Sequence, residues 1–130
     1  TCKEYTFADS NDIASVTTTA AGENDVLYVP TDNTAASNAE IINNSCLPAK
    51  VPVIAGEEGI CSGCGVATLS IAYYDIGYKA GEMGAEILMD GKDVKEMPIE
   101  VAPEVTKKYN KANCEALGIT VPDDYVVIEE

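Results

Sequence analysis

Residues 25–34 read DVLYVPTDNT and residues 51–59 read VPVIAGEEG, and these two stretches decide the fold. Each contains a continuous apolar run that predicts a strand, 26–30 in the first stretch and 51–55 in the second. Unbroken apolar runs are typical of strands that are buried on both faces, as the strands of a parallel sheet are. Each run ends in a short polar or acidic corner. The two stretches therefore predict two strands of one parallel sheet.

The segments on either side continue the alternation of strands and helices. Helices are predicted over 12–21, 34–44, 74–90 and 111–117, and further strands over 4–8, 66–72 and 98–103. A glycine- and cysteine-rich loop is predicted over 60–65, and a last apolar run covers 125–128. Repeated strand–helix units with short connections predict an α/β fold, doubly wound around a mostly parallel sheet.

The polar corners at the strand ends are the candidate ligand-binding residues, because ligands of open α/β sheets bind beyond the carboxyl ends of the strands. Hydroxyl and amide groups beside helix N-termini suit a carboxylate, and acidic groups suit an ammonium ion. Together they predict a site for a small zwitterion. The alternative is that these residues only cap helices, as Ser10 or Asn11 would cap the helix over 12–21. The candidates are Ser10, Asn11, Thr31, Asp32, Asn33, Glu57 and Glu58.

The charge balance excludes several classes of partner. The 130 residues are enough for one domain with a hydrophobic core, and they include 22 acidic and 8 basic residues, a formal net charge of −14. Such an acidic surface repels phosphate backbones and anionic lipids, so neither nucleic acid nor a membrane surface is expected as a partner. No apolar run reaches the roughly 18 residues needed to span a bilayer, and no signal peptide is recognisable. The chain is expected to be soluble as given, with any export signal removed or upstream.

Enzyme chemistry finds little support in the sequence. Histidine is missing, which removes the usual general base and the commonest metal ligand. No phosphate-binding glycine fingerprint follows the first predicted strand. A carboxylate pair such as Asp32 with Glu57 could do acid–base work, but nothing in the sequence requires it. We therefore expect a protein that is not an enzyme, with no catalytic residue, metal or cofactor.

The CxxC motif of Cys61 and Cys64 gives the main alternative function, a small thiol redox protein. A redox pair needs its first cysteine at a helix N-terminus, whereas a strand is predicted to follow this motif. A zinc site needs a second pair of ligands, and Cys46 and Cys114 lie at unrelated spacing. The remaining interpretation is a chance pair in a loop, with or without a disulfide.

Several motifs, in the same order, resemble the ABC transporter substrate-binding protein family, in the branch associated with tryptophan, tyrosine and related solutes. The match covers nearly the whole chain, and the loop over 61–65 departs from the family pattern. The motifs are DVLYVPTDNT (25–34), VPVIAGEEG (51–59), ATLSIAYYDIG (67–77), GEM (81–83) and ALGITVP (116–122).

The resemblance implies a type I periplasmic-binding-protein fold, in which two doubly wound lobes joined by a hinge enclose the ligand. This chain is similar to the second half. Residues 1–70 would form the second-lobe ligand-binding unit, and residues 71–130 would supply the hinge crossing, a helix and strands of the first lobe, and the C-terminal tail. The implied partners are ABC permease subunits and an amino-acid-like solute, of the aromatic kind that is associated with this branch. The implied location is extracytoplasmic, in the periplasm or on a cell-surface lipoprotein.

Two further expectations follow from the resemblance. The seven candidate residues above are the binding positions that it carries over, but half of a two-lobe site cannot enclose a solute, so this chain alone should bind weakly or not at all. The apolar face of the helix over 74–90, with Ile76, Met83 and Ile87, would be exposed and would favour a homodimer. A sensor domain with the same fold is a further alternative.

Overall fold

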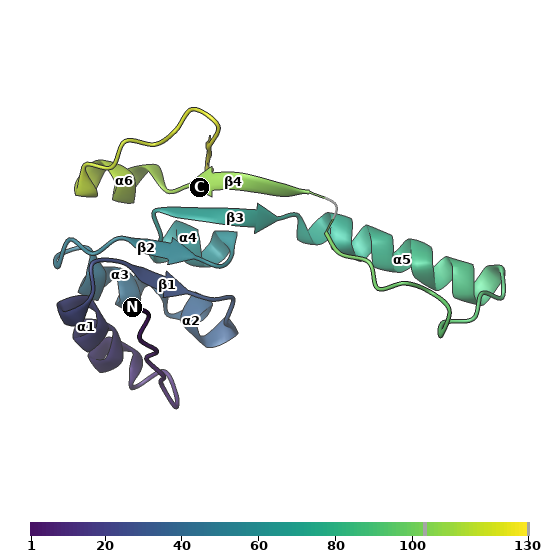
Figure 1. The fold of residues 1–130 in the computed structure, drawn as a ribbon, viewed down its shortest axis with the longest axis horizontal. Helices are drawn as coiled ribbons and strands as arrows, with labels where there is room; N and C mark the ends of the chain where they lie inside the picture. The colour runs from purple at the N-terminus through teal and green to yellow at the C-terminus, as the bar shows by residue number, and fades with distance from the viewer. Residues whose placement is uncertain (103, 130) are drawn as a thin grey trace. The chain divides into compact units, whose positions relative to one another are not determined.

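The computed structural model describes residues 1–102 and 104–129, and its strands form one sheet in the order β1-β2-β3-β4-β5 (Figure 1). Strands β1, β2 and β3 are parallel, β4 and β5 are parallel to each other, and β4 runs opposite to β3. The predicted α/β class with a mostly parallel sheet is confirmed. The strands are β1 (Leu27–Val29), β2 (Val53–Ala55), β3 (Ala67–Ile71), β4 (Val105–Tyr109) and β5 (Val126–Val127). The helices are α1 (Ile13–Glu23), α2 (Asn33–Ser37), α3 (Ala39–Cys46), α4 (Glu58–Cys64), α5 (Tyr73–Met89) and α6 (Lys111–Leu117).

The chain divides into two compact units. The first unit comprises Thr1–Ser70 together with the C-terminal segment from Thr106 onward, and the second unit comprises Ile71–Val105. The segment with β4, α6 and β5 therefore packs with residues 1–70. Among the described residues, no helix is both long and apolar enough to cross a bilayer.

The core of the first unit lies between α1, α3 and α4 and one face of the sheet. It is built from small, β-branched and thiol side chains, and the largest fully buried ones include Ile13, Ile60 and Val53. Half-buried Leu27, Val29, Phe7 and Ile128 pack against its edge. The buried cluster comprises Ile13, Ala21, Ala35, Ala39, Ile42, Cys46, Val51, Val53, Ala55, Ile60, Cys61 and Cys64.

The predicted loop over 60–65 is wrong, because these residues belong to helix α4 and its C-cap. Its glycines serve close packing. A Cβ on Gly63 would lie 2.5 Å from the Cβ of Ala39 on α3, and a Cβ on Gly65 would lie 2.8 Å from the Cα of Cys61. Gly63 thus lets α4 lie directly against α3, and tertiary contact outweighs the poor helix propensity of glycine.

The helix predicted over 34–44 is interrupted at Asn38, which ends α2 and begins α3. The Asn38 side chain donates a hydrogen bond to the Thr34 carbonyl over 2.8 Å, a local bond that competes with a continuous helix. The helices predicted over 12–21, 74–90 and 111–117 are present as α1, α5 and α6. The N-cap predicted at Ser10 or Asn11 is wrong, because the N-cap of α1 is Asp12, which makes no side-chain capping bond.

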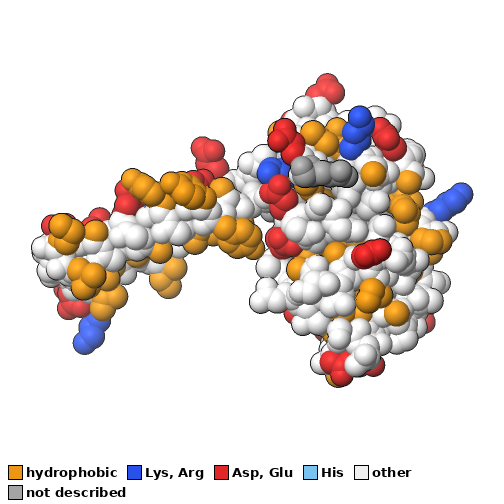
Figure 2. Space-filling model, turned by 180° about the vertical axis from the view of Figure 1, so that it is seen from behind, with side chains coloured by type: hydrophobic (Ala, Val, Ile, Leu, Met, Phe, Trp, Pro, Cys, Tyr) orange, Lys and Arg blue, Asp and Glu red, His pale blue; other side chains and the backbone are white. Residues whose placement is uncertain are grey.

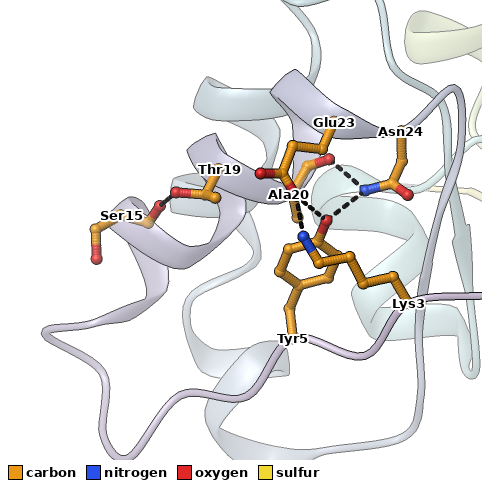
Figure 3. A network of polar contacts seen from close by, with 7 residues as sticks. All are labelled: Lys3, Tyr5, Ser15, Thr19, Ala20, Glu23 and Asn24. Atoms are coloured by element: carbon orange, nitrogen blue, oxygen red, sulfur yellow. Dashed lines mark hydrogen bonds and ion pairs between the residues drawn. The ribbon is translucent and has the colours of Figure 1, made fainter.

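The strand predicted over 4–8 is wrong, because this segment pairs with no strand. It is held instead at the end of α1 by the polar network of Figure 3. The Tyr5 hydroxyl donates to a Glu23 carboxylate oxygen over 2.6 Å and accepts from the Asn24 amide over 2.9 Å, while Lys3 pairs with the same carboxylate. Phe7 packs on the core.

The strand predicted over 98–103 is also wrong for its described residues, 98–102, which form no strand. The chain instead enters the sheet at β4, beginning at Val105. Two prolines at positions 98 and 103 frame the predicted segment, and proline cannot donate to a sheet ladder. Strand β4 is followed by the N-cap Asn110, whose backbone N–H bonds the Val66 carbonyl over 3.1 Å.

The second unit is formed by α5 and the segment that follows it. None of the 17 residues of α5 is buried, and Tyr74, Leu88 and Met89 are 78%, 87% and 82% exposed. Figure 2 shows hydrophobic side chains exposed along this unit. The rings of Tyr74 and Tyr78 stack with their centroids 6.4 Å apart. A helix with this composition is expected to need a packing partner.

Replacing the fully buried Ile60 of α4, and comparing it with an exposed residue of the sheet, tests which side chains form the core. We expect Ile60→Ala to lower the free energy of unfolding by about 2–5 kcal/mol, because it leaves a cavity between α4 and β2. The control is Leu69→Ala on β3, which is 56% exposed and should change stability by less than about 0.5 kcal/mol. Urea denaturation followed by circular dichroism measures both, and equal losses would contradict this assignment of the core.

Candidate ligand-binding site

The ends of β1 and β2 meet in one corner of the sheet. Val29 and Ala55 are register partners, and the Gly56 N–H bonds the Val29 carbonyl over 2.8 Å. The Thr31 hydroxyl then donates to the Gly56 carbonyl over 3.2 Å. A Cβ on Gly56 would lie 2.6 Å from the Thr31 nitrogen, so only glycine allows the two turns to touch. The predicted polar corners that follow the strands over 26–30 and 51–55 are therefore side by side.

In this corner Asp32 is the N-cap of α2. Its Oδ1 accepts the Ala35 N–H over 2.7 Å, which satisfies one free donor of the first helical turn. Its other carboxylate oxygen makes no hydrogen bond with the described residues, and the residue is exposed. Asn33, the first residue of α2, is exposed as well. Asp32 therefore combines a capping role with an oxygen that is open to solvent.

Glu57 caps α4 in the same way but with both oxygens. Oε2 accepts the Gly59 N–H over 2.8 Å, and Oε1 accepts the Ile60 N–H. Asp32 and Glu57 are thus helix caps, as the alternative interpretation from the sequence proposed for strand-end residues. Capping leaves further lone pairs on each carboxylate, so it does not prevent contact with a ligand.

Glu58 is bound to two side chains that were not among the residues predicted from the sequence. The Lys108 ammonium lies 2.8 Å from each of its carboxylate oxygens, and the Ser70 hydroxyl donates to Oε2 over 2.8 Å. The hydrogen bond from Lys108 is the main cause that lowers the pKa of Glu58, with a smaller contribution from Ser70, while partial burial opposes the shift. Ser70 had one sequence signal, since Thr68 and Ser70 are polar residues two apart in an apolar strand.

Ser10 and Asn11 are placed apart from this corner. They lie in an exposed turn before α1, where the Asn11 N–H donates to an Asp9 carboxylate oxygen over 2.8 Å. Among the described residues, no hydrogen bond or ion pair joins either of them to Thr31, Asp32 or Glu57. The structure therefore brings together five of the seven predicted residues.

The corner is open surface rather than a closed pocket. A hollow of about 380 Å³ lies in the second unit, and another of about 330 Å³ lies between residues 4–6 and α1. Neither contains a predicted ligand residue. Thr31, Asp32 and Asn33 are exposed, so a ligand held at this corner would remain open to solvent on its other side.

The CxxC motif does not have the properties of a redox centre. Cys61 and Cys64 are both buried in α4, and burial raises the pKa of each thiol to about 12. Burial likewise raises the pKa of Cys46 to about 11. The attacking species in thiol exchange is the thiolate, so these thiols are poor nucleophiles. Within the described residues no cluster of three potential metal-binding side chains occurs.

Comparison with known proteins places the chain among solute-binding proteins. A family model described as ABC transporter substrate binding protein matches residues 1–129. A tyrosine-binding protein of Clostridioides difficile (strain R20291) is 36% identical over 116 residues, which are 89% of this chain and 33% of that protein. The chain thus spans about a third of the length of this curated relative.

Solved structures agree with this assignment. The ligand-free, open structure of a substrate-binding protein with adhesive properties from Clostridium difficile is 34% identical, with a TM-score of 0.74 over 95% of this chain and 42% of that one. An ABC domain in complex with L-Trp from Streptococcus pneumoniae is 27% identical, with a TM-score of 0.83 over 97% of this chain and 44% of that one.

The burial of the thiols leads to a test of the redox alternative. In the native chain at mildly alkaline pH we expect Ellman's reagent to modify only Cys2, the one exposed cysteine, and to modify all five after denaturation in urea. A Cys2→Ser variant should then show no rapid reaction. Rapid modification of Cys61 or Cys64 in the folded chain would contradict the assignment of these residues to the core.

Proposed function

Because this chain belongs to the ABC transporter substrate-binding protein family, we propose that it forms the ligand-holding part of an extracytoplasmic solute-binding protein that binds an amino acid and delivers it to ABC permease subunits. The observation that carries the proposal is the family match over residues 1–129. Its relatives are named as a tyrosine-binding protein and as a domain solved with L-Trp, which supports an aromatic amino acid as the solute. On this proposal the chain binds and releases its solute without changing it chemically.

The corner between β1 and β2 would recognise the two charged groups of an amino acid. The open oxygen of Asp32 suits the α-ammonium group, since a charge-assisted hydrogen bond there needs no rearrangement of the α2 cap. The Asn33 amide offers a donor for the carboxylate, while the Thr31 hydroxyl, whose one proton is donated to the Gly56 carbonyl, keeps a lone pair that can accept from the ammonium group. Of the other carried-over positions, Glu57 and Glu58 border this corner, whereas Ser10 and Asn11 lie apart from it in the turn before α1.

The two units correspond, in this proposal, to parts of two lobes. Residues 1–70 would be the second-lobe ligand-binding unit, and residues 71–130 would contain the hinge crossing, the α5 region of the first lobe and the C-terminal tail. The facing wall of the site would come from parts of the relatives that this chain does not span. The proposed location is outside the cytoplasm, in the periplasm or on a cell-surface lipoprotein.

This proposal predicts weak solute binding by the chain alone. In ¹H–¹⁵N spectra, millimolar L-tryptophan should shift the amides of Thr31, Asp32 and Gly56, and calorimetry should detect no micromolar affinity, because the ligand is held on one side only. Asp32→Asn should abolish the shifts, since asparagine keeps the α2 cap but removes the charge.

The matched control is Glu40→Gln, which removes one charge from the exposed first turn of α3 and should leave the shifts unchanged. Micromolar affinity in the isolated chain would contradict the half-site. No shift at the corner even at the highest soluble concentration of L-tryptophan would contradict the proposed role of these residues.

Association of this chain with itself is the second prediction of the proposal. With no buried residue in α5, we expect a homodimer in sedimentation velocity at micromolar concentration, because water is excluded from Ile76, Met83 and Ile87 when two helices pack. The double variant Ile76→Glu/Ile87→Glu should be monomeric. A wild-type chain that stays monomeric at high micromolar concentration would exclude this association.

A further inference from the structure

The ion pair between Glu58 and Lys108 differs from the other ion pairs of the described chain. Its side chains are 37% and 28% exposed, whereas every side chain in the other pairs is at least 39% exposed. Lys108 approaches both oxygens at 2.8 Å, and Ser70, which is 6% exposed, adds a third hydrogen bond. Exposed pairs contribute little to stability, but a partly buried pair with several charge-assisted bonds holds its groups in place. Glu58, Ser70 and Lys108 are called the Glu58 cluster below.

The Glu58 cluster joins both strands that connect the two units. Ser70 is the last residue of the first unit on β3, the strand that leads out of it. Lys108 lies on β4, the strand that returns, three residues after the unit boundary at Val105. Glu58 is the first residue of α4 and follows directly on Glu57 and Gly56. The carboxylate of the first residue of α4 therefore binds both the outgoing strand, at Ser70, and the returning strand, at Lys108.

A second feature of β3 lies on the same face as Ser70. Thr68, two residues earlier, is 3% exposed, and its hydroxyl is the one buried side-chain oxygen or nitrogen in the described chain that has no hydrogen-bond partner. Side chains two residues apart on a strand point to the same side. The buried face of β3 thus carries, beside the bound Ser70, a hydroxyl that has no partner among the described residues.

We propose that Lys108 is a positioning residue for the solute site: through Glu58 it fixes the start of α4, and with it the Gly56–Thr31 corner, to the two strands that connect the units. The inference rests on the proposed function and deepens it. Lys108 then acts through Glu58 without contact with the solute, whereas Asp32 contacts it directly. Because coupling between sites is reciprocal, a solute bound at the corner would in turn favour the arrangement of β3 and β4 in which the cluster is closed.

The test compares Lys108→Met, Lys108→Arg and the neighbour Lys107→Met. Lys107 lies on the same strand and forms an exposed ion pair with Asp124, so Lys107→Met is a control that also removes one lysine and one ion pair from β4. We expect Lys108→Met to shift the amides of Gly56, Glu57 and Thr31 and to speed hydrogen exchange at Ser70 and Ile71 by about tenfold, the loss expected for a hydrogen bond to a charged group. Lys108→Arg should restore both, and Lys107→Met should change neither.

A spectroscopic titration separates this role from a general loss of structure. The folded-state pKa of Glu58 is lowered, so the cluster should be intact above the ordinary pKa of a glutamate and should open as the pH falls through the lowered value. The ¹³C signal of the Glu58 carboxyl should titrate at higher pH in Lys108→Met, where Glu57 and Cys61 remain as its titratable neighbours. If that variant does not fold, Glu58→Gln, which keeps an acceptor for Ser70, should give the same amide shifts.

The outcomes distinguish the two proposals. Amide shifts in Lys108→Met that are confined to β4 and Glu58, with an unchanged corner, would overturn the positioning role. Failure of Lys108→Arg to restore the corner amides would overturn it too, because the charge would then not be the cause. If the corner responds to Lys108→Met but L-tryptophan shifts no amide of the wild-type chain, the coupling stands and the proposed solute is wrong.

Discussion

The close contact of Gly56 with Pro30 and Thr31 is the constraint on which the candidate site depends. Parallel pairing brings the ends of β1 and β2 to one edge of the sheet, but pairing alone would leave the two turns separate. The missing side chain at Gly56 lets the turns touch, and the Thr31 hydroxyl then binds the Gly56 carbonyl. This contact converts two strand ends into a single polar corner and places the starts of α2 and α4 next to each other.

Within that corner, the three acids differ in how much of each carboxylate is already used. Glu58 is bound by Lys108 and Ser70, and Glu57 caps α4 with both oxygens, whereas Asp32 caps α2 with one oxygen and leaves the other open. A cationic group that approached the corner would therefore find its strongest unoccupied acceptor at Asp32. The high net negative charge of the chain says little about this preference, because the local hydrogen bonds decide which acid is available.

Each of the two units has an apolar surface that is exposed to solvent. Tyr28 and Ile54 are register partners on the sheet face away from α3 and α4, and both are exposed, although parallel sheets are usually covered on both faces. In the second unit, α5 buries none of its residues. Contiguous exposed apolar surface of this kind is typical of protein regions that contact another protein surface.

Apolar runs and helical spacing are properties of short segments, so the sequence alone was enough to predict the strands over 26–30, 51–55 and 66–72, the helices α1, α5 and α6, and the α/β class. It was also enough to place Thr31, Asp32, Glu57 and Glu58 at the strand ends. Tertiary contacts decided the rest. Gly63 allows helix α4 to pack closely on Ala39 of α3, and residues 4–8 lie outside the sheet, where Tyr5 is hydrogen-bonded to Glu23 and Asn24 at the end of α1. The partnership of Glu58 with Lys108, 50 residues away, was beyond any local pattern, since it exists only where β4 returns beside β3.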